Sequence, residues 1–160
     1  MSGSRLYPDR PFLASSVCVV RDGLVLLAAR AKPPLEGVFT LPGGVVEAGE
    51  ALAETALREL REEVGVEAEI VGFVGPVEVV ERDETGRVKH HFVICAHAAR
   101  WRAGEGEVGD EALAVRWIRP DELGRLRTTA GIQAIVDAAV ALTSHAPTSS
   151  PDGEPALTSS

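Results

Sequence analysis

Short apolar runs at strand-like spacing, separated by turn signals, make up the first part of the chain. Residues 15–21 (SSVCVVR) and 24–30 (LVLLAAR) flank the pair Asp22-Gly23, which is a strong short-range signal for a β-hairpin. A Pro/Gly loop follows, then residues 38–41 (VFTL) predict a short strand and residues 41–44 predict a turn. The pattern therefore predicts a hairpin and a third short strand before any helix.

A helical period replaces the strand period in residues 51–64. The apolar positions that recur at this spacing are Leu52, Ala53, Ala56, Leu57, Leu60 and Val64. Gly65 then stands where a helix C-cap glycine belongs. We expect an amphipathic helix from about 51 to 64, with one flank left to polar residues.

Strand patterns return after this helix. They cover residues 67–74 and 76–81, interrupted by Gly75-Pro76, and after a polar turn at 82–87 they cover 88–99 and 113–118. Residues 120–123 predict a turn or the start of a short helix, and residues 129–142 predict a final helix. Strands on either side of a helix, with a closing helix, indicate an α/β or α+β layered domain with a mixed sheet.

Length and composition fit one globular domain. The 160 residues are 45% hydrophobic and 25% charged. We assign residues 1–10 to an N-terminal extension, 11–142 to the domain, and the Ser/Thr/Pro-rich residues 143–160 to a disordered tail. Cys18 and Cys95 each lie in an apolar run and are expected to be buried free thiols.

Charge and hydropathy exclude some partners. No apolar run approaches the ~18 residues of a membrane span, and no secretory signal pattern opens the chain, so we expect a cytoplasmic protein with no membrane contact. The net charge of −8 argues against nucleic acid as a partner. A small anionic substrate stays possible, because a bound cation neutralises carboxylates and phosphates together.

Three acidic residues share one flank of the predicted helix. Glu59, Glu62 and Glu63 are neighbours at helical spacing and repel one another unless a cation lies among them. Mg²⁺ or Mn²⁺ prefers such oxygen ligands and shares them with substrate phosphates. The alternative is a solvated helix face on which Arg58 and Arg61 pair with the glutamates.

The wider pattern decides between these readings. It has a fixed spacing: Gly44, five residues, Glu50, seven residues, then Arg58, Glu59, Leu60, Glu62, Glu63, Gly65 and Val66. This segment resembles the Nudix box at every specified position, and Leu41-Pro42-Gly43 resembles the usual lead-in. The resemblance covers about residues 10–142 and implies an α/β/α sandwich with a mixed sheet. It also implies a divalent-metal-dependent hydrolase that cleaves a pyrophosphate bond, with Mg²⁺ or Mn²⁺ as cofactor.

The resemblance also assigns roles to residues. It implies that Glu59, Glu62 and Glu63 are catalytic metal ligands, joined by the Gly43 carbonyl, and that one glutamate acts as general base. Arg58 and Glu50 would support the loop–helix geometry. In some members the base comes from a loop outside the box, and here the 102–112 loop offers acidic residues, with Glu107 and Glu111 as candidates.

Substrate contacts are predicted outside the acidic flank. Arg30 ends a strand and could hold a phosphate, although a surface arginine is an alternative, and Phe39 could stack on a base or belong to the core. Gly44 allows close backbone approach to a phosphate. His91 is a substrate candidate, and it cannot easily share a metal with His90 because adjacent strand residues point to opposite faces.

The substrate itself is less defined than the bond. Similarity to bacterial members grouped with ADP-ribose pyrophosphatases favours a nucleoside diphosphate linked to another moiety. The first alternative is a nucleoside triphosphate pyrophosphohydrolase with a housekeeping role, and the second is a nucleotide-sensing module without catalysis. The resemblance further implies a homodimer.

Overall fold

A mixed sheet between two helices forms the body of the molecule in the computed structural model, which describes residues 4–32 and 35–146. The strands of this 7-stranded sheet are β1 (Phe12–Arg21), β2 (Leu24–Arg30), β3 (Phe39–Thr40), β4 (Gly43–Val45), β5 (Glu67–Arg82), β6 (Val88–Ala103) and β7 (Ala112–Ile118). The helices are α1 (Leu52–Val64), the 3₁₀ helix η1 (Pro120–Arg125) and α2 (Ile132–His145).

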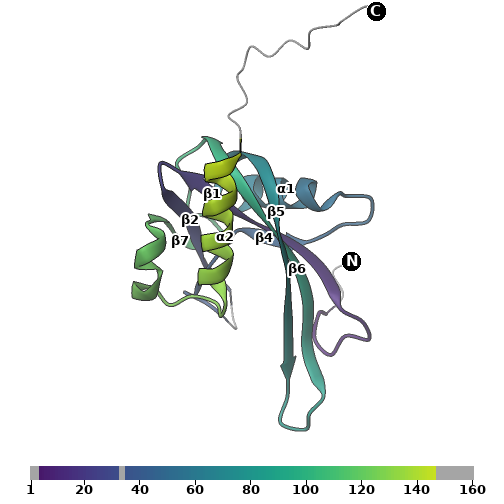
Figure 1. Cartoon of the computed structure of the whole chain (residues 1–160). Helices are drawn as coiled ribbons and strands as arrows, with labels where there is room; N and C mark the ends of the chain where they lie inside the picture. Colours follow the sequence, from purple (N-terminus) through teal and green to yellow (C-terminus); the bar gives the residue numbers. More distant parts are fainter. Residues whose placement is uncertain (1–3, 33–34, 147–160) are drawn as a thin grey trace, which may run out of the picture.

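Strand β1 lies at the centre and separates two cores. Val17 and Val19 pack toward α1 with Leu60, whereas Cys18 and Val20 pack toward α2, because successive side chains of a strand point to opposite faces. Figure 1 shows α2 in front of the sheet and α1 behind it. The predicted α/β/α sandwich is confirmed.

The sheet is mixed because β1 runs parallel to β6, while its pairings with β2 and β4 are antiparallel. Strands β3, β2, β1, β6 and β5 lie side by side in this order, and β7 pairs with β2. The predicted hairpin between β1 and β2 is confirmed, with Asp22 and Gly23 at φ values of 50° and 79°. In this topology α1 contacts β1, β4 and β7.

Two predictions, one about β5 and one about the turn at 41–44, are wrong. Gly75-Pro76 does not interrupt a strand, because β5 runs from Glu67 to Arg82 and absorbs the pair at a register shift opposite β6. Proline is tolerated there because β5 is an edge strand. The expected turn at 41–44 is in part strand β4, since Gly43 and Gly44 pair with β1.

The ends of the chain differ from expectation in detail. Helix α2 starts at Ile132, later than the expected 129, and continues to His145, into the expected tail. The rest of that tail, residues 147–160, lies outside the described residues, as do residues 1–3 of the extension. Tyr7, within the described part of the extension, donates its N–H to the Lys89 carbonyl oxygen at 2.9 Å. None of the described helices has the length and hydropathy that a membrane span requires.

Candidate metal centre

Helix α1 supplies two of the acidic side chains because its apolar stripe fixes its rotation. Ala56, Leu60 and Val64 are buried against the sheet, which leaves Glu59 and Glu63 on the flank beside β4. Gly65 adopts the left-handed conformation at φ 66° and ends the helix, donating its N–H to the Arg61 carbonyl oxygen, as the sequence predicts. The helix therefore holds both glutamates at one edge of the sheet.

Strand β4 brings its backbone into contact with these glutamates. A Cβ atom on Gly44 would lie 2.5 Å from the Glu59 carboxylate, so a larger residue there would displace that carboxylate. The Gly43 N–H donates to Glu63 Oε1 at 3.3 Å. The two glycines thus allow the carboxylates to lie directly against the main chain.

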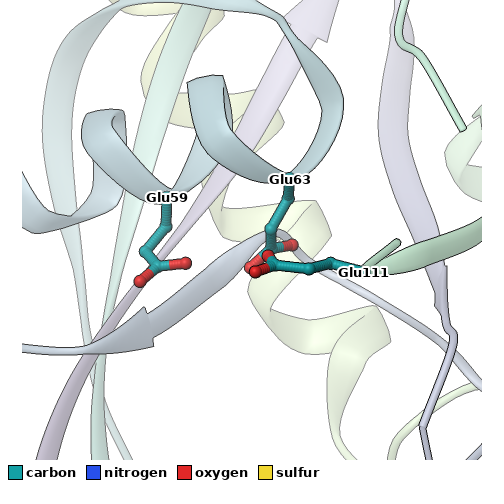
Figure 2. A group of neighbouring side chains, drawn as sticks. All are labelled: Glu59, Glu63 and Glu111. Carbon is teal, nitrogen blue, oxygen red and sulfur yellow. The ribbon is translucent and has the colours of Figure 1, made fainter. Parts of the chain in front are cut away.

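Glu111 completes a group of three carboxylates. One oxygen each from Glu59, Glu63 and Glu111 lies within 4.8 Å of the others, among the residues that the structure describes. In Figure 2, Glu59 and Glu63 extend from α1, and Glu111 reaches toward Glu63 from the side. Glu111 is exposed and immediately precedes β7, and its carbonyl oxygen accepts the Ala31 N–H at 3.2 Å. The base candidate from the loop therefore lies beside two predicted ligands.

Arg58 forms the supporting network next to this group. Its Nε and Nη2 donate to both Glu50 carboxylate oxygens at 2.7 and 2.9 Å, a bidentate pair. The Thr55 hydroxyl and the Glu47 N–H also donate to Glu50. Arg58 Nη1 donates to Glu59 at 2.9 Å and to Glu62 at 3.1 Å. The arginine ties the loop before α1 to the acidic flank.

Two carboxylates of the group, Glu59 and Glu63, have raised pKa values. Burial, together with the charges of Glu59 and Glu111, raises the pKa of Glu63 to about 8, although the Gly43 N–H acts in the opposite direction. Burial also raises the pKa of Glu59, against the lowering effect of Arg58. Like charges at this distance favour protonation of one member unless a cation binds. The site therefore has the electrostatic character of a cation site.

Other predicted residues lie outside this group. Glu62 is 55% exposed in its side chain and pairs with Arg58, so the three-carboxylate group does not include it. The Glu107 N–H donates to the Val64 carbonyl oxygen at 2.8 Å, at the end of α1, and its carboxylate is not in the group either. The structure brings together Glu59, Glu63 and Glu111.

The substrate candidates are spread over the sheet. Arg30 is exposed and pairs with Ala112, the residue after Glu111, so it lies at the same sheet end as the carboxylates. Phe39 packs against the core on the α2 face, with the Arg116 guanidinium 6.0 Å from its ring. His91 pairs with Val80 on the β5–β6 hairpin, and both His90 and His91 are half-buried.

Sequence reasoning missed two supporting side chains. The Thr55 hydroxyl reaches Glu50 at 3.1 Å, and the buried Ser15 hydroxyl donates to the Leu52 carbonyl oxygen at 2.7 Å, at the start of α1. Thr55 could have been found, since it lies within the first turn of the predicted helix. Ser15 could not, because its contact joins residues 37 positions apart.

Comparisons with known proteins agree with this architecture. A family model described as "NUDIX domain" matches residues 11–138. An ADP-ribose pyrophosphatase of Methanocaldococcus jannaschii is 31% identical over 122 residues, which cover 76% of this chain and 69% of that protein. A CTP pyrophosphohydrolase of Escherichia coli is 34% identical over 106 residues, covering 65% of this chain and 73% of its own length.

A solved structure shares the fold. The crystal structure of a MutT NUDIX hydrolase from Burkholderia pseudomallei superposes with a TM-score of 0.71 at 27% identity, covering 81% of this chain and 98% of the other. The similarity therefore covers most of this chain.

Proposed function

This chain belongs to the Nudix hydrolase family, and we propose that it is a metal-dependent hydrolase of nucleoside diphosphates linked to a second moiety. Membership of the family, with relatives named as pyrophosphatases and pyrophosphohydrolases, makes it a hydrolase acting on pyrophosphate bonds. The observation that carries the metal dependence is the group of Glu59, Glu63 and Glu111 beside Gly43 and Gly44.

The donor set fits a hard divalent ion. Three carboxylates converge within 4.8 Å, and the half-buried Glu63 has a raised pKa that a cation would lower. Glu59, Glu63 and Glu111 would hold Mg²⁺ or Mn²⁺, and the Gly43 carbonyl and Glu62 remain proposed further ligands. Such an ion, when bound, would polarise a phosphate oxygen and make a bound water more acidic.

The chain's own residues would then have separate roles in hydrolysis. Arg58 holds Glu59 and, through Glu50, the loop before α1, so that the acidic flank keeps its place against β4. We propose Glu111, the exposed member of the group, as the general base. It takes a proton from the attacking water as the water oxygen bonds to phosphorus, and the P–O bond to the leaving phosphate breaks. Arg30, at the same sheet end, would contact a substrate phosphate.

An ADP-ribose-type substrate is our first choice. It is supported by the relative named ADP-ribose pyrophosphatase, at 31% identity over 76% of this chain. The second candidate, a nucleoside triphosphate, is favoured by the relative named CTP pyrophosphohydrolase. Phe39, Gly44 and His91 remain proposed contacts of the substrate.

A substrate panel tests this function directly. The chain would be incubated with Mg²⁺ and ADP-ribose, NADH, dinucleoside polyphosphates or nucleoside triphosphates, and products separated by chromatography. We expect ADP-ribose to give AMP and ribose 5-phosphate. Cleavage of triphosphates to monophosphate and pyrophosphate alone would select the second candidate. Binding without cleavage of any panel member would favour a nucleotide-sensing module.

Two broader expectations accompany this proposal. A homodimer would be seen as twice the chain mass of 16.9 kDa in sedimentation, and a monomer would refute it. A cytoplasmic location stays an expectation, and the net charge of −8 argues against nucleic acid as a partner. Binding of RNA and DNA would be measured at low and at high salt. Absence of binding at both would support the exclusion of nucleic acid as a partner.

A further inference from the structure

The loop that leads to Glu111 is fastened to the sheet by a group remote from the carboxylates. We call Arg21, Trp101, Trp117 and Glu105 the Arg21 clamp. The Arg21 guanidinium lies 3.8 Å from the Trp101 ring centroid and 5.5 Å from that of Trp117. It donates to both Glu105 carboxylate oxygens at 2.8 and 3.1 Å. Arginine suits this place because its planar fork both stacks and pairs bidentately.

Both indoles also bind the loop backbone. Trp101 Nε1 donates to the Gly104 carbonyl oxygen at 2.7 Å, and Trp117 Nε1 donates to that of Glu105 at 2.8 Å. The clamp thus fixes two consecutive peptide units at the start of the loop. A salt bridge alone on this surface would do little, but here four hydrogen bonds and two ring contacts act on the same short segment.

The clamped segment lies against the end of the helix that carries Glu63. A Cβ atom on Gly104 would collide with the Gly65 carbonyl oxygen, and the Glu107 N–H donates to the Val64 carbonyl oxygen at 2.8 Å. The loop start therefore packs directly on the last turn of α1. Between this contact and Glu111 the loop is exposed, with Val108 at 63%.

We propose that the Arg21 clamp positions Glu111 relative to Glu63, by holding the 104–111 loop against the C-terminal end of α1. This inference rests on the proposed function, because it takes the three carboxylates as a cation site. The contacts of the clamp residues given above are with one another and with the loop backbone, and none of these residues belongs to the three-carboxylate group. They act through the loop.

The test compares Arg21→Gln and Trp117→Phe with the unchanged chain. Trp117→Phe keeps an aromatic ring but removes the N–H that holds Glu105. We expect Mn²⁺, measured by electron paramagnetic resonance, to bind about fivefold more weakly, somewhat less than the ~10-fold to 100-fold typical of a ligand's direct outer partner. Amides of residues 104–111 should exchange hydrogen faster in the metal-free variants. Arg119→Gln, which breaks the surface pair with Asp121 at 3.0 Å, is the matched control and should change neither quantity.

A double-mutant cycle separates positioning from general loosening. In a Glu111→Gln background, Arg21→Gln should no longer weaken Mn²⁺ binding, because its effect passes through Glu111. An undiminished effect in that background, or no effect in the unchanged one, would overturn the proposal. Failure of the unchanged chain to bind Mn²⁺ or to hydrolyse any panel substrate would instead overturn the proposed function.

Discussion

Glu50 and Glu63, at the two ends of one segment, have carboxylates in opposite electrostatic environments. Glu50 accepts hydrogen bonds from Arg58, the Glu47 N–H and Thr55, which lower its pKa to about 2. Glu63 accepts a hydrogen bond from the Gly43 N–H, and burial among like charges raises its pKa to about 8. Both residues belong to the same box, yet only one has its charge compensated by the fold.

This difference distinguishes a structural carboxylate from a ligand. The charge of Glu50 is stabilised by neighbours that fold with it, so it serves the architecture. The charge of Glu63 needs a partner that the described chain does not provide, and a divalent cation is the partner that three oxygen donors fit. Removing each charge in turn tests this difference.

The largest effect is expected from Glu63→Gln. Glutamine keeps the shape but loses the charge that would bind the ion, and metal stabilisation of the transition state contributes several kcal/mol. Hydrolysis of the best panel substrate should therefore fall by at least about 100-fold. Glu54→Gln, on the exposed side of α1, is the control and should leave the rate unchanged. Retention of activity by Glu63→Gln would end the assignment of the site.

A smaller loss is expected from Glu50→Gln, because Glu50 acts through Arg58. The rate should fall roughly 10-fold to 100-fold, as for outer partners of metal ligands. Unlike Glu63→Gln, this change should also lower the melting temperature at neutral pH. The stabilisation by Glu50 is present above its ordinary pKa of 4.5 and is lost as the pH falls through about 2. The melting temperatures of the unchanged chain and of Glu50→Gln should therefore converge in acid. A difference between them that does not depend on pH would contradict the charge-based role.

Glu62→Gln tests whether Glu62 belongs to the Arg58 network or to the metal ligands. The Glu62 side chain is 55% exposed and lies 3.1 Å from Arg58 Nη1, between the supporting network and the carboxylate group. If Glu62 is one ligand among several, its replacement should weaken Mn²⁺ binding by about tenfold. A Mn²⁺ affinity equal to that of the unchanged chain would show that Glu62 is not a ligand.

Sequence reasoning located the helix and its acidic flank because both depend on local spacing. The apolar stripe of α1 and the cap at Gly65 can be read from adjacent residues, and both are found in the structure. Strand β5 was divided in error because Gly75-Pro76 looks like a turn, whereas a register shift at a sheet edge accommodates it. Local signals do not report whether a strand lies at an edge.

The third carboxylate could not be chosen from the sequence. The 102–112 loop contains several acidic residues, and only tertiary contacts bring Glu111, rather than Glu107, to the group. The same holds for Trp117, whose indole N–H donates to the Glu105 carbonyl oxygen 12 positions away. Contacts between residues far apart in the chain determine which side chains join the site, and local spacing does not predict them.

The smallest expected effect concerns the metal-free protein and pH. A carboxyl with a raised pKa in the fold destabilises it as pH rises from 4.5, the ordinary value for Glu63, to about 8, because the folded state then binds more protons than the unfolded one. Added Mg²⁺ must displace that proton, so its binding strengthens over the same range. Mg²⁺ at a fixed concentration, about 100 times its dissociation constant at pH 8, adds about 2.7 kcal/mol at that pH, which is several degrees in melting temperature. The shift, followed by scanning calorimetry, should be larger at pH 8 than at pH 5.5. Glu63→Gln should abolish most of this pH dependence, whereas an equal shift at both pH values would mean that Mg²⁺ binds away from Glu63.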